Sequence, residues 1–269
     1  MTRDDFVREL YDHDTYTTPP GRVRPFPARH PLWASTKFHL RNLCSIIRTV
    51  RLVKREGFYY PKWPDASFEV VNTLEASGGR MEVSGFSNLV QAEQPTVYVC
   101  NHMSLLETFL LPIFLLEFSY VSFVVKESLI RYPVFGHITR ASDPIAVSRE
   151  NARQDLKQVL QRGEEKLQQG RSVAIFPQAT RSVSFSHSAF NTLGAKLAEK
   201  NDTAVVPVAV RTDFLREGRI FKDFGMVDPS KPVCFSFGPA FKGDAKQMHG
   251  HVVDFITSQL REWDIPVRD

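Results

Sequence analysis

Residues 96–107 read TVYVCNHMSLLE, and a fold can be argued outward from this stretch. Four of its first five residues are hydrophobic, and several of the five are β-branched or aromatic, which predicts a buried strand. Asn101 and His102 follow where that strand ends. Ser104, with Glu107 three residues later, has the spacing of a capping box at the start of a helix. The stretch therefore predicts a strand, a polar turn and a helix in succession.

The same alternation continues on both sides. Strands are predicted at 68–72, 81–85, 96–100, 119–125, 143–147, 172–176, 204–210 and 233–237. Helices are predicted at 150–169, 188–200 and 245–262. Apolar strands that alternate with helices indicate an α/β fold with a central, largely parallel sheet flanked by helices. Ligands of such sheets bind beyond the carboxyl ends of the strands, so the residues after 96–100 and 172–176 are of first interest.

The N-terminal region has a different pattern. Residues 1–30 are expected to form an irregular arm, because prolines at 19, 20, 25 and 27 oppose regular structure. Residues 32–56 predict a basic amphipathic helix. Its apolar positions are Leu40, Leu43, Ile47 and Val50, and its basic positions are Lys37, Arg41, Arg48 and Arg55.

This pattern is typical of a membrane-interface segment, and a surface helix packing its apolar face on the core is the alternative. We therefore divide the chain into residues 1–65, the arm and candidate membrane-interface helix, and residues 66–269, the α/β domain.

Composition excludes several classes of protein. With 269 residues, 42% of them hydrophobic, the chain has enough apolar side chains for a large core and is not intrinsically disordered. The net charge of +4 is mild and suits anionic partners. Cys44, Cys100 and Cys234 are widely spaced, which favours a reducing compartment over a disulfide framework. We expect neither a secretory signal nor a transmembrane helix.

His102 and Glu107 form the candidate catalytic pair. A carboxylate bonded to one imidazole nitrogen fixes the tautomer and leaves the other nitrogen free to act as a base. The alternative is that Glu107 only completes the helix cap and that His102 is an ordinary loop residue.

A second polar segment, FPQATRS at residues 176–182, follows the strand at 172–176. The planar guanidinium of Arg181 suits a phosphate group, and Thr180 and Ser182 add hydroxyls. Lys126 and Arg149 each end another apolar strand. Together the three cations predict an anion pocket beside His102, although each alone would be ordinary surface charge.

The order and spacing of these segments over about residues 80–240 resemble the glycerolipid acyltransferase family, whose prototype is 1-acylglycerol-3-phosphate (lysophosphatidate) acyltransferase. The family motif Asn-His-x4-Asp is similar to Asn101-His102-x4-Glu107. The later blocks are matched by Lys126, Leu129, Pro133, Gly136, Ile145, Val147 and Arg149, then by Phe176, Pro177, Thr180, Arg181, Ser182, Phe190 and Gly194, and finally by residues 205–209.

The sequence departs from the family pattern at three positions. Glu107 replaces the Asp, which moves the carboxylate one methylene farther out. Gln178 and Ala179 replace Glu and Gly, which removes a negative charge and adds a Cβ that disfavours positive φ. These changes favour an altered headgroup preference.

The resemblance implies an acyltransferase in which His102, oriented by Glu107, is the general base. The acceptor is a lysophospholipid, most simply 1-acylglycerol-3-phosphate, and the co-substrate is acyl-CoA or acyl-carrier protein, with no cofactor or metal. Substrate contacts are expected from Lys126, Arg149, Gln178, Thr180, Arg181 and Ser182. The protein is expected at a membrane lipid surface, peripherally on the cytoplasmic face.

Two other functions remain open. The three substitutions are compatible with a catalytically weak homologue that only binds lipid. The basic stretch at 22–55 is compatible with nucleic-acid binding, but it lacks base-reading or stacking motifs and lies outside the α/β core, so no nucleic-acid partner is expected.

Overall fold

The computed structural model describes residues 1–23, 31–57, 62–132, 135–218 and 222–269. Pro25, Pro27 and Pro133, which entered the sequence predictions, lie outside these ranges.

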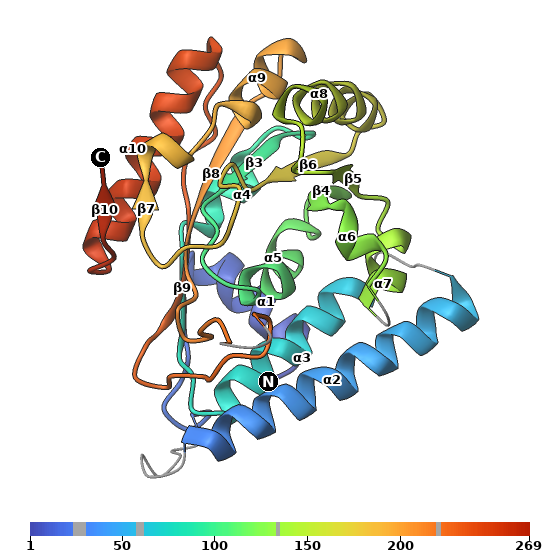
Figure 1. Cartoon of the computed structure of the whole chain (residues 1–269). Coiled ribbons are helices and arrows are strands. Elements are labelled where there is room, and N and C mark those ends of the chain that lie inside the picture. Colours follow the sequence, from blue (N-terminus) through green and yellow to red (C-terminus); the bar gives the residue numbers. More distant parts are fainter. Residues whose placement is uncertain (24–30, 58–61, 133–134, 219–221) are drawn as a thin grey trace.

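An eight-stranded sheet forms the centre of the molecule (Figure 1). In spatial order its strands are β1 (Tyr16–Thr17), β2 (Met81–Ser84), β9 (Val233–Phe237), β8 (Val205–Arg211), β3 (Val97–Cys100), β6 (Ser172–Ile175), β4 (Val121–Lys126) and β5 (Ile145–Val147). In this spatial order, β8, β3, β6, β4 and β5 are all parallel to their neighbours, whereas β9 is antiparallel to β8. The predicted α/β fold with a largely parallel sheet is therefore confirmed. A separate small sheet pairs β7 (Phe185–Ser186) with β10 (Val267–Arg268).

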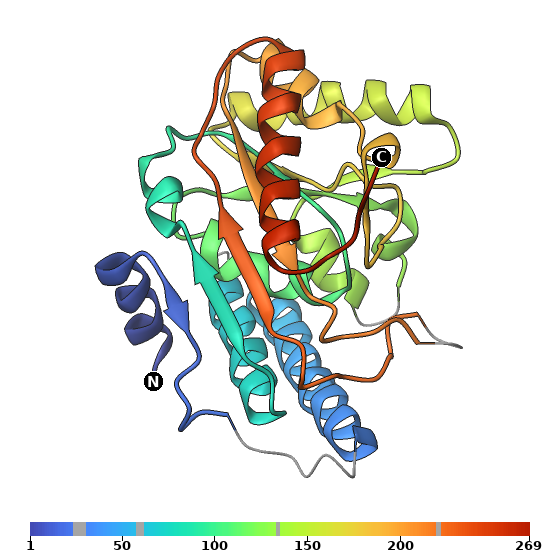
Figure 2. The same cartoon turned by 90° about the vertical axis from the view of Figure 1, so that its left-hand side faces the viewer.

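Helices cover both faces of the sheet. One face carries α8 (Ala152–Gln168), α9 (Leu193–Lys200), which follows a short 3-10 turn at His187–Ala189, and α10 (Ala245–Glu262). Figure 2 shows α10 lying along β8. The other face carries α1 (Arg3–His13), α3 (Lys62–Ala76), α4 (Phe86–Gln91) and α5 (Leu106–Leu115), with α2 (Pro31–Glu56) packed against α3. The short helices α6 (Glu127–Ile130) and α7 (Phe135–Ala141) connect β4 to β5.

Strand β3 shows why the sequence pattern is continuous rather than alternating. All of its residues are buried. Tyr98 and Cys100 belong to the core under α5, whereas Val97 and Val99 belong to the core under α9. A central parallel strand covered on both faces needs apolar side chains at every position. This double burial fixes the end of β3, and with it the residues that follow.

The strand predicted at 68–72 is wrong, because these residues lie within α3. The helix buries Phe68, Val71 and Leu74, which recur at helical spacing, and it packs against α5. A short apolar run does not distinguish a buried helix from a strand, and here helix packing decides. The boundary predicted between residues 65 and 66 falls inside the same helix.

The prediction of an irregular arm over residues 1–30 is wrong for its first part. Thr2 caps α1 in a reciprocal capping box with Asp5, and the helix buries Phe6 and Leu10 in the core. Prolines begin at residue 19 and therefore do not oppose this helix. After it, Tyr16 and Thr17 add β1 to the edge of the sheet.

The predicted basic helix is confirmed as α2, but its apolar side chains do not all face the core. Ala34 and Phe38 are buried, whereas Leu40 and Leu43 are 57% and 41% exposed. Leu32 and Trp33 are each 69% exposed at its start. Of the predicted apolar face, Val50 is buried, as the alternative of packing on the core requires. Leu40 and Leu43 are exposed, which that alternative does not explain.

Two general features concern the environment of the protein. Within the described ranges, no helix combines the length and the apolarity that a membrane span requires. The three cysteines are free, with Cys100 and Cys234 buried and Cys44 exposed on α2.

Candidate active site

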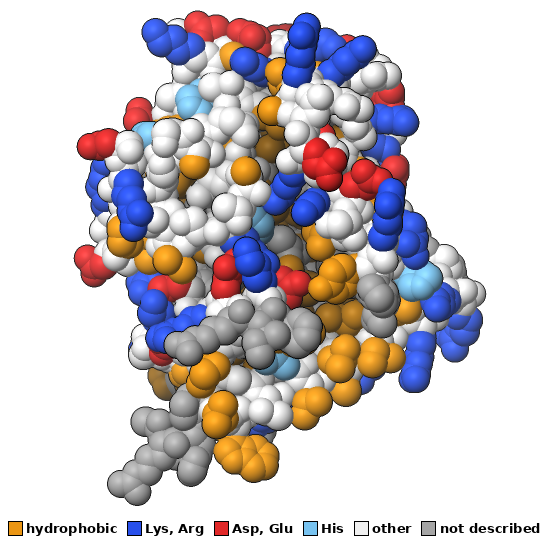
Figure 3. All heavy atoms as spheres, in the orientation of Figure 1, with side chains coloured by type: hydrophobic (Ala, Val, Ile, Leu, Met, Phe, Trp, Pro, Cys, Tyr) orange, Lys and Arg blue, Asp and Glu red, His pale blue; other side chains and the backbone are white. Residues whose placement is uncertain are grey.

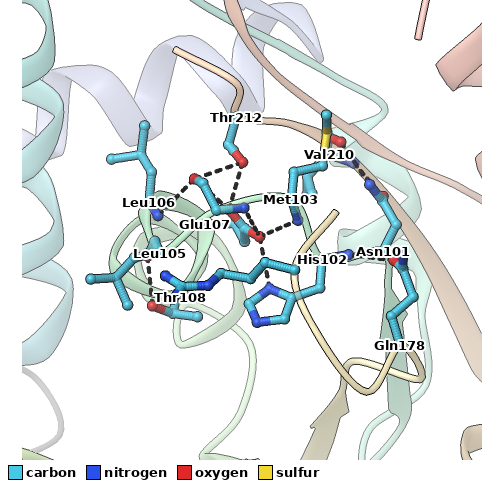
Figure 4. Close-up of polar contacts among 12 residues, drawn as sticks. Asn101, His102, Met103, Leu105, Leu106, Glu107, Thr108, Gln178, Val210 and Thr212 are labelled. Atoms are coloured by element: carbon cyan, nitrogen blue, oxygen red, sulfur yellow. Dashed lines mark hydrogen bonds and ion pairs between the residues drawn. The ribbon is translucent and has the colours of Figure 1, made fainter. Parts of the chain in front are cut away.

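The carboxyl end of β3 places His102 beside the first turn of α5 (Figure 4). His102 Nδ1 lies 2.8 Å from Glu107 Oε1. The Glu107 side chain is fully buried, and that of His102 is 12% exposed. The longer side chain of glutamate therefore reaches the imidazole in this fold.

Glu107 is held at both of its oxygens. Oε1 also accepts from the backbone N–H groups of Met103 at 2.7 Å and Ser104 at 2.9 Å. Oε2 accepts from Ser104 Oγ at 3.0 Å and from Thr212 Oγ1 at 2.6 Å. Helix α5 begins at Leu106 without a side-chain cap in the usual position. Glu107 thus bonds the loop backbone, as the cap interpretation expected, and orients His102 as well.

The electrostatic balance keeps Glu107 ionised. Burial alone would raise its pKa, but the hydrogen bond to His102, the charge of that ring and the hydroxyl of Thr212 outweigh burial, so the pKa is lowered. Because an ionised carboxylate only accepts hydrogen bonds, Nδ1 of His102 carries a proton, and in the neutral form of the ring Nε2 is the unprotonated nitrogen. The lone pair of Nε2 is then available for a substrate proton. The His102 ring stacks on Phe176, with centroids 4.5 Å apart.

The segment after β6 supports the backbone of His102. Gln178 is buried, and its Oε1 accepts from the His102 backbone N–H at 2.7 Å. The Ser182 backbone N–H donates to the His102 carbonyl at 2.9 Å. An amide oxygen serves as this acceptor without adding charge, which gives a structural role to Gln178. Thr180 lies exposed on the same segment.

A cavity of about 230 Å³, open to solvent, adjoins His102. Its polar wall includes Lys126, Arg149, Arg181 and Asp223. Its apolar wall comes from α3, α5, α7 and the central strands, and includes Trp63, Leu105, Phe109, Phe123, Val125, Leu129, Ile138 and Phe176. The structure therefore brings the three predicted cations to one cavity with the histidine. Gln178, Thr180 and Ser182 do not form part of its wall.

Arg149 is fixed in an unusual backbone conformation. Its φ of 62° lies in the left-handed region, which is uncommon for residues other than glycine. Asp155 accepts from the backbone N–H groups of Ser148 at 2.8 Å and Arg149 at 2.7 Å, which holds the turn. The guanidinium donates to the carbonyl of Ala179, and burial together with the nearby charge of Arg181 lowers its pKa. Such strained positions often accompany ligand sites.

Arg181 is paired with two acids that the sequence did not suggest. Its Nη2 lies 2.8 Å from Asp223 Oδ1, and its Nε lies 3.3 Å from Glu217 Oε1. Both acids belong to the segment between β8 and β9. No motif marks them, because they are distant in sequence and lie in a loop. Lys126 is the last residue of β4 and is exposed.

Thr212 is the other residue missed from the sequence. It follows β8, which is adjacent to β3, so it meets Glu107 at the same edge of the sheet. Thr212 could have been found in the sequence as a polar residue that directly follows a predicted parallel strand. Asn101 links the same two strands, since its side chain exchanges hydrogen bonds of 2.8 Å with the Val210 backbone.

The fold and this geometry define a class: α/β proteins with a histidine–carboxylate pair and a cationic cavity at the carboxyl edge of a parallel sheet. Residues 80–211 match a family model described as Acyltransferase. The solved structure of the 1-acyl-sn-glycerophosphate acyltransferase PlsC from Thermotoga maritima shares the fold, with a TM-score of 0.64 and 18% identity, covering 87% of this chain and 96% of that one.

Curated relatives of the chain are also described as acyltransferases. The 1-acyl-sn-glycerol-3-phosphate acyltransferase of Pseudomonas aeruginosa is 34% identical over 155 residues, which is 58% of this chain and 58% of that protein. The chloroplastic LPAT1 of the same description from Arabidopsis thaliana is 29% identical over 131 residues, which is 49% of this chain and 36% of that protein. The chain thus spans between about a third and three fifths of these relatives. Over about half of its length, the chain is thus similar to acyltransferases that act on glycerolipids.

Proposed function

We propose that the protein transfers a fatty acyl group from an acyl thioester to the free hydroxyl of a lysophospholipid, with 1-acylglycerol-3-phosphate as an acceptor. The observation that carries the proposal is the His102–Glu107 contact of 2.8 Å at the wall of a cavity that also holds cations and a broad apolar surface. Relatives whose names state this activity support it.

In the proposed mechanism, His102 Nε2 accepts the proton of the acceptor hydroxyl while its oxygen attacks the thioester carbonyl carbon. The tetrahedral intermediate then collapses, the carbon–sulfur bond breaks, and the leaving thiolate takes the proton from the imidazolium. Glu107 keeps the ring oriented and stabilises its charge. The donor is acyl-CoA or acyl-carrier protein, and the reaction needs no resident cofactor.

The substrate would lie with its phosphate toward Arg149 and Lys126 and its chain along the apolar wall. Cations offering several N–H donors suit a phosphate. Phe109, Phe123 and Ile138 present apolar surface in the same cavity. Gln178 contributes indirectly, through the backbone of His102. Thr180 and Ser182 do not line the cavity and remain candidate contacts from the loop that follows β6.

We further propose that α2 places the protein peripherally on the cytoplasmic face of a membrane. Leu32, Trp33, Leu40 and Leu43 are exposed along it, and Figure 3 shows apolar side chains along the lower edge of the molecule, where α2 runs in this view. Lys37, Arg41, Arg48 and Arg55 lie on the same helix. Apolar and basic side chains together favour an anionic lipid surface.

The test is thiol release from long-chain acyl-CoA, and in parallel from acyl-carrier protein, with a panel of lysophospholipids. Acceptor-dependent release is expected from the wild type and should fall about 10²–10⁴-fold in His102→Ala, the usual contribution of a positioned base. His13→Ala, an exposed histidine on α1, is the matched control.

Equal release by wild type and His102→Ala would refute the mechanism. Folded protein that binds lysolipid yet releases no thiol from either donor would instead establish the alternative, a lipid-binding homologue.

A further inference from the structure

The two acids that pair with Arg181 lie in different surroundings. Asp223 Oδ1 is 2.8 Å from Arg181 Nη2, and Glu217 Oε1 is 3.3 Å from Arg181 Nε. Asp223 and Arg181 both line the cavity beside His102, whereas Glu217 does not. Among the described residues of this wall, Asp223 is the single acid. Asp223 therefore contacts Arg181 from within the cavity, and Glu217 contacts it from outside the wall.

The charge of Asp223 opposes what the rest of the polar wall favours. Lys126, Arg149 and Arg181 attract an anion. Burial and then the nearby charge of Arg181 lower the pKa of Arg149, so the two guanidinium groups are close enough to repel each other. An acid among these cations reduces their repulsion in the free protein. A phosphate that approaches Arg181, however, meets the negative charge of Asp223 on the same guanidinium.

Rotation of the Asp223 side chain is enough to release Arg181. The Asp223 side chain is 27% exposed, so water is at hand for a displaced carboxylate. The backbone just after it is fastened to α2, where His39 Nε2 lies 2.7 Å from the Gly225 carbonyl oxygen. Glu217 remains on Nε and keeps the guanidinium oriented. Exchange of the carboxylate for another anion therefore requires no rearrangement of the loop.

We infer that Asp223 is an internal competitor for the acceptor phosphate, which holds Arg181 in the free protein and gives way when the lysophospholipid binds. The inference rests on the proposed function and names a residue that sets the affinity of the same site. The proposed function places the phosphate beside Arg149 and Lys126, close to Arg181. Arginine has five N–H donors, so a phosphate that takes Nη2 from Asp223 leaves Nε on Glu217.

Competition of this kind affects both ends of the reaction. Asp223 weakens binding of the acceptor and so raises its KM. The product carries the same phosphate, so the return of Asp223 to Arg181 also favours product release. The competitor thus exchanges affinity for turnover.

The experiment compares full-length wild type with Asp223→Asn, which keeps the shape of the side chain and removes its charge. In calorimetry, Asp223→Asn should bind glycerol 3-phosphate about tenfold more tightly than wild type, the scale of one charge-assisted hydrogen bond. In acyl transfer, its KM for lysophosphatidate should fall by a similar factor without a rise in kcat. Asp202→Asn is the control and should match wild type, because Asp202 pairs with Lys242 and is absent from the cavity wall.

A second background tests whether Asp223 acts through Arg181. Arg181→Gln removes the group for which phosphate and carboxylate compete. Adding Asp223→Asn to that variant should tighten binding of glycerol 3-phosphate by less than about threefold, because effects of two residues in contact are not additive. A full gain in both backgrounds would mean general charge repulsion and would overturn the inference.

The direction of the change in affinity is decisive. If Asp223 only positions Arg181 for the phosphate, Asp223→Asn will bind glycerol 3-phosphate more weakly than wild type. Weaker or equal binding therefore overturns the inference. Because calorimetry needs no turnover, tighter binding supports the inference even where thiol release fails, and its absence overturns the inference even where acyl transfer is observed.

Discussion

Glu107 divides its two carboxylate oxygens between different tasks. Oε1 contacts His102 and the loop backbone, and Oε2 contacts Thr212 and Ser104. Glutamate therefore keeps the contact with His102 despite its extra methylene. The hydroxyls of Thr212, after a neighbouring strand, and of Ser104, in the loop, hold its other oxygen, Oε2. We regard Thr212 as a positioning residue that acts through Glu107.

Replacing Thr212 with Val should lower kcat about fivefold to tenfold with little change in KM, because one hydrogen bond to the carboxylate is lost, worth roughly 1 kcal/mol. Thr212→Ser retains the hydroxyl and should restore most of kcat. Steady-state kinetics of acyl transfer at several pH values would check this. Equal losses in the Val and Ser variants would assign Thr212 a packing role only.

Glu107 should also give the protein a stability that is lost in acid. Its folded-state pKa lies below the ordinary 4.5, so ionisation favours the folded state. This stability is fully present above the ordinary pKa and disappears as pH falls through the lower folded value. Urea unfolding of wild type and Glu107→Gln at about pH 7 and about pH 4 should show a smaller difference in the acid. A constant difference would contradict the assignment.

At the scale of elements, α2 combines two roles on different faces. Phe38 is buried and packs on Phe214, with ring centroids 5.7 Å apart. Leu40, two positions later, is 57% exposed. The helix is thus anchored by one side while its leucines remain available to another surface.

The double substitution Leu40→Ser and Leu43→Ser should weaken binding to anionic phospholipid vesicles about tenfold, because both side chains would lie at the lipid interface. The melting temperature should hardly change, since neither side chain is in the core. Vesicle co-sedimentation measures the first, and calorimetry the second. Val90→Ser, an exposed valine on α4, is the control, and an equal loss in that variant would argue against α2 as the contact surface.

The central strands were predictable because each is buried on both faces. β3, β6 and β8 consist almost entirely of buried residues, so their apolar runs stand out in the sequence and their ends place His102 and the FPQATRS segment. The segment at 68–72 has equally apolar residues, but its partner is α5 rather than a strand. The local sequence does not reveal whether such an apolar segment will pack against a helix or pair with a strand.

The candidate site was predictable in part, namely for the residues that strand ends and helix starts position. His102, Glu107, Lys126, Arg149 and Arg181 follow strands or begin helices, so topology brings them together. Asp223 and Glu217 come from a loop between β8 and β9 whose course depends on contacts with α2. Such contacts join residues almost two hundred positions apart, and no spacing rule anticipates them.

At the scale of the whole molecule, the N-terminal segment completes the core. Phe6 is fully buried, and its ring lies 4.7 Å from that of Tyr16 and 6.1 Å from that of Phe114 on α5. Glu75 then fastens the chain, accepting from Tyr16 Oη at 2.6 Å and from Arg22 Nε at 2.6 Å. The N-terminal residues therefore belong to the same core as the sheet.

Phe6→Ala should destabilise the protein by about 3–5 kcal/mol, the usual cost of a large cavity in a core. Arg8→Ala, exposed on the same helix, should stay within about 0.5 kcal/mol of wild type. Denaturant unfolding checks both. A small effect of Phe6→Ala would mean that α1 detaches readily from the remaining core.

The cysteines give the molecule a built-in attachment point. Burial raises the pKa of Cys100, and burial with the charge of Glu82 raises that of Cys234 to about 12, so both thiols resist alkylation in the folded protein. Cys44 is exposed on α2, one position after Leu43. A maleimide dye will therefore label native protein selectively, at a position that senses polarity beside the proposed lipid surface. The same thiol will add a constant background to any colourimetric assay of released coenzyme A.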